Sequence, residues 1–145
     1  MIKELGHFTP QFTILYLLLN AFHTTENTQK QYIYLFFVSL FDYALLGPSL
    51  KTFTQYTGLH SSRPMYPQLN GMPSGHTQLL WLIFTYFYLN NDNFNTYLFG
   101  ILAIFTTFQR IYSGMHSQKQ VFVGFLLGIL MGYIWFHIYK FIVQS

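Results

Sequence analysis

The chain contains no cysteine and very little charge: of its 145 residues, 8% are charged, seven of them lysine or arginine and four aspartate or glutamate. The missing cysteines exclude disulfides and thiolate metal sites. A soluble domain carries about 25% charged residues, so this chain does not have the composition of one. Instead, 52% of its residues are hydrophobic and 21% are aromatic. The composition therefore predicts an integral membrane protein, and a net charge of +3 is too small to indicate a nucleic-acid partner.

Acidic residues are too few and too scattered for a metal-dependent hydrolase. The four carboxylates are Glu4, Glu26, Asp42 and Asp92. Two-metal phosphatases assemble their sites from clustered acids and histidines, so we expect no metal and no cofactor. Asp42 falls inside an apolar run, where a charge is costly, and we expect it to pair with Lys51 or with a tyrosine hydroxyl.

Five apolar runs follow one another along the chain, at residues 8–22, 31–47, 76–90, 94–109 and 121–143. A helix needs about 20 residues to cross the hydrocarbon core, so the shorter runs must recruit flanking polar residues. Backbone polar groups in lipid have to be satisfied within the chain, which favours a helical bundle. We predict an all-α fold: a multi-pass membrane bundle of about five transmembrane helices, forming one domain over residues 1–145.

Residues 48–75 form the one long break between runs and contain four of the five prolines. Long loops in compact domains are often functional. If each run crosses the membrane once, this loop and the break after residue 109 lie on the same face. The breaks at residues 23–30 and 90–95 are short polar turns on the opposite face.

Three polar stretches on the shared face combine arginine, histidine and glycine. The chain has two arginines, and each belongs to one of these stretches. The stretches are Arg63-Pro64, then Pro73-Ser74-Gly75-His76, then Arg110 with His116 and Gln120. Guanidinium groups in a chain this poor in charge indicate phosphate chemistry, because their planar fork matches an oxyanion.

These stretches resemble the motifs of the type 2 phosphatidic acid phosphatase superfamily, which includes lipid phosphate phosphatases, polyprenyl diphosphatases and the vanadium haloperoxidases. The resemblance covers roughly residues 45–130. The family's Pro-Ser-Gly-His motif is matched in full, and Gln120 replaces the acid that ends its third motif. The first motif has a lysine seven positions before the arginine, whereas Lys51 lies twelve positions before Arg63.

The resemblance implies a role for each motif residue. His116 would attack phosphorus and form a phosphohistidine, and His76 would protonate the leaving group and later activate water. Gln120 would accept the Nδ1 hydrogen of His116 and orient it. The residues implied to bind phosphate are Arg63, Arg110, Ser74, Gly75 and, through a five-residue insertion, Lys51. An alternative replacement for the missing lysine is His60.

The sequence of residues 71–78 is most similar to that of the dolichyl diphosphatase branch, which favours a polyprenyl or dolichyl diphosphate as substrate. A phosphatidate-type lipid phosphate phosphatase and a phosphotransferase are alternatives within the enzyme class. A further alternative is a catalytically silent relative that binds lipid phosphate or a partner membrane protein. It is kept because the lysine is out of register and the family usually has a sixth helix. A soluble haloperoxidase is disfavoured, since no segment outside the runs is large enough to form a domain.

Glycines recur every four residues in the last run, at Gly124, Gly128 and Gly132. This spacing indicates close helix packing, either within the chain or in a homo-oligomer through the last helix.

Sidedness is not decided by charge. The lysines outside the motifs divide equally, with Lys3 and Lys119 on the motif face and Lys30 and Lys140 on the other. The resemblance implies that the motif face is lumenal or extracytoplasmic.

Overall fold

The computed structural model describes residues 8–144, so Lys3 and Glu4 lie outside the described residues. The named elements are α2 (Thr9–His23), α3 (Glu26–Phe41), η1 (Asp42–Leu46), α4 (Gly47–Tyr56), α5 (Gly75–Leu89), α6 (Asn93–Tyr112) and α7 (Gln118–Gln144). All are helical, and residues 8–144 contain no strand beyond an isolated bridge between Ser62 and Asn70. The all-α prediction is confirmed for these residues, and the apolar runs are helical except at two ends, Phe8 and Asn90.

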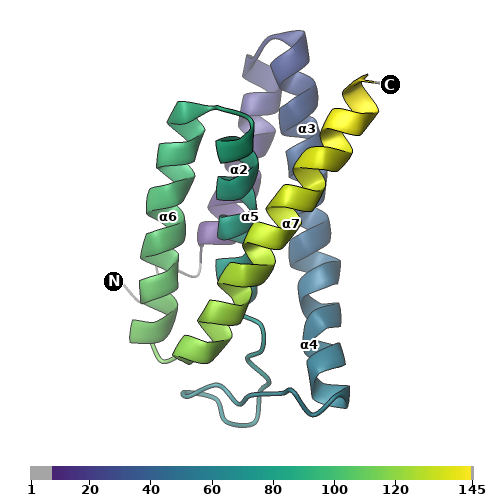
Figure 1. Cartoon of the computed structure of the whole chain (residues 1–145). Coiled ribbons are helices and arrows are strands. Elements are labelled where there is room, and N and C mark those ends of the chain that lie inside the picture. Colours follow the sequence, from purple (N-terminus) through teal and green to yellow (C-terminus); the bar gives the residue numbers. More distant parts are fainter. Residues whose placement is uncertain (1–7, 145) are drawn as a thin grey trace.

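Helices α3, η1 and α4 follow one another without a break and form one long rod (Figure 1). The prediction that residues 48–75 are loop is therefore wrong for residues 48–56. The reason lies in the π-helical turn η1, where the amide of Gly47 bonds to the carbonyl of Asp42. Proline lacks an amide and collides with the carbonyl four residues earlier in an α-helix, and a π-turn changes that register. Pro48 follows this turn directly, so the helix continues past it.

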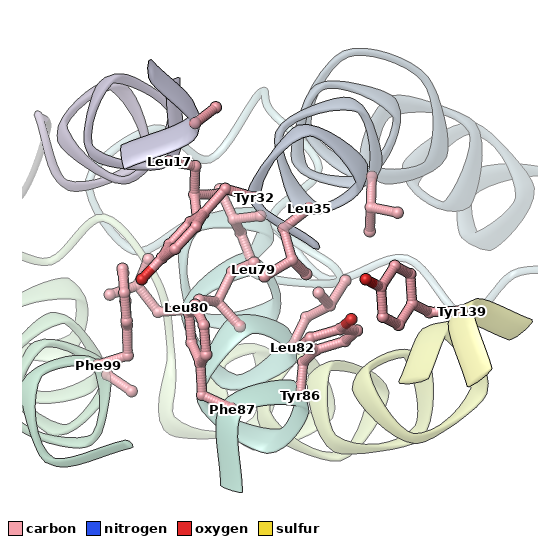
Figure 2. Close-up of a cluster of buried hydrophobic side chains, with 14 residues drawn as sticks. Leu17, Tyr32, Leu35, Leu79, Leu80, Leu82, Tyr86, Phe87, Phe99 and Tyr139 are labelled. Carbon is pink, nitrogen blue, oxygen red and sulfur yellow. The ribbon is translucent and has the colours of Figure 1, made fainter. Parts of the chain in front are cut away.

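Helix α5 forms the centre of the bundle. Its buried apolar side chains are Leu79, Leu80, Leu82, Ile83, Tyr86 and Phe87. Figure 2 shows this cluster meeting Leu17 of α2, Leu35 of α3, Phe99 of α6 and Tyr139 of α7. A helix that is buried nearly all round needs neighbours on every side, which explains why the other helices surround it.

Helix α7 packs closely on α5 through Gly124, Gly128 and Gly132. A Cβ atom at these positions would lie 2.5 to 2.6 Å from backbone oxygens at the beginning of α5 and along it, those of Ser74, Gln78 and Leu82 respectively. The glycine spacing therefore serves packing within the chain. A homo-oligomer through the last helix would have to use another face of α7, and it stays a prediction.

The outer surface of the helices is rich in large apolar side chains, and the interior contains polar as well as apolar ones. Large apolar side chains point outward on the helices, for example Phe37, Ile101 and Phe141. Polar side chains are buried between the helices; they include Thr13, Ser39, Asp42, Gln78 and Thr106. Within residues 8–144, two helices, spanning residues 28–56 and 118–143, are long and apolar enough to cross a membrane. The number of crossings stays a prediction.

The ends of α4 and α6 and the beginnings of α5 and α7 lie at the same end of the bundle, where the 57–74 loop runs beneath them (Figure 1). The three motif stretches therefore lie at one end of the protein.

Candidate active site

A cavity of about 430 Å³ lies at this end of the bundle. Its wall is built from η1 and α4, the 57–74 loop, the beginning of α5, the end of α6 and the turn before α7. The motif residues that line it are Lys51, Arg63, Gly75, His76, Arg110 and His116. Stretches that are far apart in the sequence thus share one cavity.

Three cations line the cavity from three different elements: Lys51 from α4, Arg63 from the loop and Arg110 from the last turn of α6. Arg110 is 2% exposed, and its Nε and Nη1 have no hydrogen-bond partner in the described part of the chain; nor has Nε of Arg63. The one ion pair among residues 8–144 joins Lys30 to Glu26 on the surface. Burial lowers the pKa of Arg63. Buried donors without partners are costly, so this cavity is suited to an anion that would satisfy them.

His116 is buried in the turn between α6 and α7, and its Nδ1 lies 3.1 Å from Oε1 of Gln120. The same oxygen accepts the amide of Ser117 at 3.1 Å. Nε2 of Gln120 donates to the carbonyls of Ser61 and Ser62, each at 2.8 Å. Because these acceptors fix the orientation of the amide, Nδ1 of His116 is the donor and its Nε2 keeps a lone pair.

The charge state of His116 follows from its surroundings. Burial first, and then the positive charges of Arg110, Arg63 and Lys51, lower its pKa from 6.5 to about 3, while the hydrogen bond with Gln120 opposes this. The imidazole is therefore neutral near pH 7, which is the form that can act as a nucleophile.

Helix α5 begins at Gly75, and its N-cap residue Ser74 makes no side-chain capping bond. Ser74 is fully buried, its hydroxyl lies 3.0 Å from that of Thr77, and it is not among the residues that line the cavity, so its contact with phosphate stays a prediction. A Cβ atom at Gly75 would meet no heavy atom within 4 Å. That open space adjoins an uncapped helix N-terminus, which favours anions. The ring of His76 contacts that of Tyr43 edge to face, with centroids 6.1 Å apart.

Asp42 also lines the cavity and is 1% exposed. The expected pairing with Lys51 or a tyrosine hydroxyl is not what the structure shows, since its Oδ1 accepts a 2.7 Å hydrogen bond from Nε2 of Gln78. The π-turn η1 and α5 bring these two side chains together, a contact that the sequence pattern did not indicate.

His60, the alternative replacement for the motif lysine, is exposed and does not line the cavity.

Sequence reasoning missed Asn70, whose side chain makes two hydrogen bonds to α4 and two to amides within the loop. The Asn-Gly pair at residues 70–71 is typical of any turn, so nothing in the sequence distinguished Asn70 as a site residue.

Among residues 8–144, no group of three or more histidine, cysteine, aspartate or glutamate side chains is placed to hold a metal ion.

The described part of the chain is helical and apolar on its outside, and two histidines and three unpaired cations surround one cavity. These features are those of a membrane-associated protein with an oxyanion site. The chain belongs to the PAP2 superfamily, whose family profile matches residues 10–144. The resemblance found in the sequence motifs is thereby confirmed.

Curated relatives align with about half of the chain. Lipid phosphate phosphatase gamma of Arabidopsis thaliana is 34% identical over 79 residues, covering 46% of this chain and 35% of that protein. Dolichyldiphosphatase 1 of Dictyostelium discoideum is 34% identical over 90 residues, covering 53% and 39%. Dolichyldiphosphatase 1 of Mus musculus is 34% identical over 83 residues, covering 46% and 35%. The chain thus spans little more than a third of the length of these relatives. No solved structure matches it significantly.

Proposed function

We propose that this protein is a metal-independent membrane phosphatase that hydrolyses a lipid-linked phosphate or diphosphate through a phosphohistidine. One observation carries the proposal: His116, held by Gln120, shares a cavity with His76 and with three cations that have no carboxylate partner. A cavity dominated by fixed positive charge stabilises the oxygens of a phosphoryl group in transfer without a metal.

The reaction takes two steps. Nε2 of His116 attacks phosphorus while the bond to the leaving oxygen breaks, and His76 donates a proton to that oxygen. His76 then takes a proton from water, whose oxygen attacks the phosphohistidine and releases inorganic phosphate and the free imidazole. Gln120 accepts the Nδ1 hydrogen throughout, which keeps the reactive nitrogen in place.

The phosphoryl oxygens are bound by Lys51, Arg63 and Arg110, together with the amides at the beginning of α5 near Gly75. The hydroxyl of Ser74 lies 3.0 Å from that of Thr77 at the beginning of α5, and its contact with phosphate stays a prediction. Lys51 takes the place of the motif lysine although it is out of register, because the rod formed by α3, η1 and α4 extends to the cavity.

Two kinds of named relative bear on the substrate. The dolichyldiphosphatases favour a polyprenyl diphosphate, and the plant lipid phosphate phosphatase supports a phosphatidate-type monoester as the second candidate. We further propose that all five helical rods cross the bilayer as one domain and that the site opens on the lumenal or extracytoplasmic face. The outward-facing apolar side chains support this arrangement.

The test is phosphate release by detergent-purified protein in EDTA, from a polyprenyl diphosphate and from phosphatidate. We expect release from the wild type and none from His116→Ala, because the mutant has no nucleophile. His76→Ala should retain a residual rate, lower by about a hundredfold or more.

Activity that disappears in EDTA and returns with magnesium would refute the metal-independent mechanism. Undiminished turnover by His116→Ala would refute the assignment of His116 as the nucleophile. No release from either lipid by folded wild type would favour the silent, phosphate-binding relative.

A further inference from the structure

Asn70 lies in the 57–74 loop, and its side chain ties the loop to α4. Its Nδ2 donates to the carbonyl of Lys51 at 2.8 Å and to the hydroxyl of Thr54 at 2.9 Å. Its Oδ1 accepts from the amides of Ser61 at 3.2 Å and Met72 at 3.0 Å. Both hydrogens and both lone pairs of one side-chain amide are therefore used.

Arg63 lies in the part of the loop that Asn70 supports. The backbone amide of Arg63 donates to the carbonyl of Leu69 at 3.1 Å, and the neighbouring Ser62 forms a β-bridge with Asn70. Asn70 thus holds the segment that carries one cavity cation while bonding to the backbone of Lys51, which carries another.

The hydrogen bonds continue from the loop to His116. The carbonyl of Ser61, whose amide bonds to Asn70, accepts Nε2 of Gln120 at 2.8 Å. Oε1 of Gln120 in turn accepts Nδ1 of His116 at 3.1 Å. One connected set of bonds therefore runs from α4 through Asn70 to the imidazole.

We infer that Asn70 is a positioning residue of the phosphate site. It sets Arg63 relative to Lys51 and keeps the Ser61 carbonyl in place for Gln120. The inference rests on the proposed function, because that function assigns a phosphoryl group to the cavity. A guanidinium displaced by about 1 Å loses much of its alignment with phosphate oxygens. Phosphate affinity therefore depends on the loop contacts that hold Arg63 in place.

Thr54 offers matched variants, because it is the one partner of Asn70 that bonds through its own side chain. Thr54→Val removes the hydroxyl and Thr54→Ser keeps it. Thr52→Val is the control, since Thr52 is exposed on the same helix and its hydroxyl bonds only within the helix, to the carbonyl of Pro48. Asn70→Ala removes all four bonds.

The measurement is the dissociation constant of inorganic phosphate, by calorimetry on the full chain in detergent, followed by KM and kcat with a polyprenyl diphosphate. We expect Asn70→Ala to raise the phosphate Kd about tenfold or more, and Thr54→Val to raise it less. Thr54→Ser and Thr52→Val should keep the wild-type value. KM should rise more than kcat falls, a split that mere loss of folded protein would not produce.

Wild-type phosphate affinity in folded Asn70→Ala and Thr54→Val would overturn the inference; if Asn70→Ala does not fold, the Thr54 variants decide alone. Phosphate binding requires no turnover, so the two proposals fail separately. A wild-type chain that binds phosphate but hydrolyses neither lipid refutes the proposed hydrolysis while the Kd series still decides the role of Asn70. A wild-type chain that binds no phosphate overturns the inference about Asn70, while the release assay still decides the proposed hydrolysis.

Discussion

The side-chain Nε2 of Gln120 donates hydrogen bonds to two backbone carbonyls, those of Ser61 and Ser62, each at 2.8 Å. A carboxylate at this position would place a negatively charged oxygen against both carbonyls, whereas the amide donates to both. Its Oε1 is still an acceptor for His116. The amide that departs from the family motif is therefore matched to the loop of this particular chain.

The low pKa of His116 leads to a prediction about acid. The folded-state pKa of about 3 lies below the ordinary 6.5, so the unfolded chain binds this proton more readily. The resulting stability is fully present above pH 6.5 and is lost as the pH falls toward 3. Through the weakly acidic range we expect His116 to stay neutral and able to attack phosphorus.

NMR of the histidine ring nitrogens checks this, with the His116→Asn variant to assign the signal. Bound phosphate should raise the pKa of His116, because the anion offsets the charges of Arg110, Arg63 and Lys51. A His116 signal that titrates near pH 6.5 in the phosphate-free protein would contradict the expectation.

At the scale of elements, the contact between α5 and α7 should not tolerate a side chain. In Gly128→Ala the new Cβ would lie 2.5 Å from the carbonyl oxygen of Gln78 and 2.7 Å from Cβ of Trp81. The two helices have to separate to admit it, and overpacking of this kind costs about 1–3 kcal/mol. We expect a lower thermal unfolding temperature in detergent.

Gly75→Ala is the control for stability, because a Cβ there meets no heavy atom within 4 Å. Its unfolding temperature should match or exceed that of the wild type. Equal unfolding temperatures for Gly128→Ala and the wild type would show that the helices can part without loss.

The sequence was sufficient to find the helices, because apolar runs of this length in a charge-poor chain have few alternatives to a helix. It failed at residues 48–56, since Pro48 usually marks a helix boundary. The π-turn that carries the helix past Pro48 is a choice of backbone register, and no residue type in η1 marks it.

For the whole molecule, the order of runs and breaks was enough to predict that the motif stretches share one end. Which side chains reach the cavity depends on local packing instead. Ser74 faces Thr77, and Asn70 acquires its partners only when the loop meets α4. The contacts of Asn70 with α4 have no sequence spacing that could have indicated them, whereas Ser74 and Thr77 are three residues apart in one helical turn. Family membership and the motif positions were predictable, and the roles of the site residues stay predictions.

The proposed multi-pass topology can be tested directly because the chain has no cysteine of its own. Single cysteines at four exposed positions report the side of the membrane: Thr25→Cys, His60→Cys, Lys119→Cys and Val143→Cys. With a membrane-impermeant maleimide in oriented vesicles, we expect the variants at 60 and 119 to label from one side. Those at 25 and 143 should label from the other, because one candidate span lies between 25 and 60 and the second lies between 119 and 143.

Labelling of the variants at 25 and 60 from the same side would mean that the rod of α3, η1 and α4 does not cross the bilayer. The same comparison between 119 and 143 decides the crossing of α7.

The turn before α7 brings His116 and the first turn of α7 brings Gln120, whereas the cations come from earlier parts of the chain. A ribosome delivers the chain from its N-terminus at about 5–20 residues per second, so α4, the loop and α5 are made seconds before this turn. Until α7 packs its glycines against α5, His116 lacks the Gln120 amide that holds both the imidazole and the loop. If the proposed function holds, a nascent chain stalled before α7 has the cations and the imidazole of its site, but the imidazole lacks the amide that orients it.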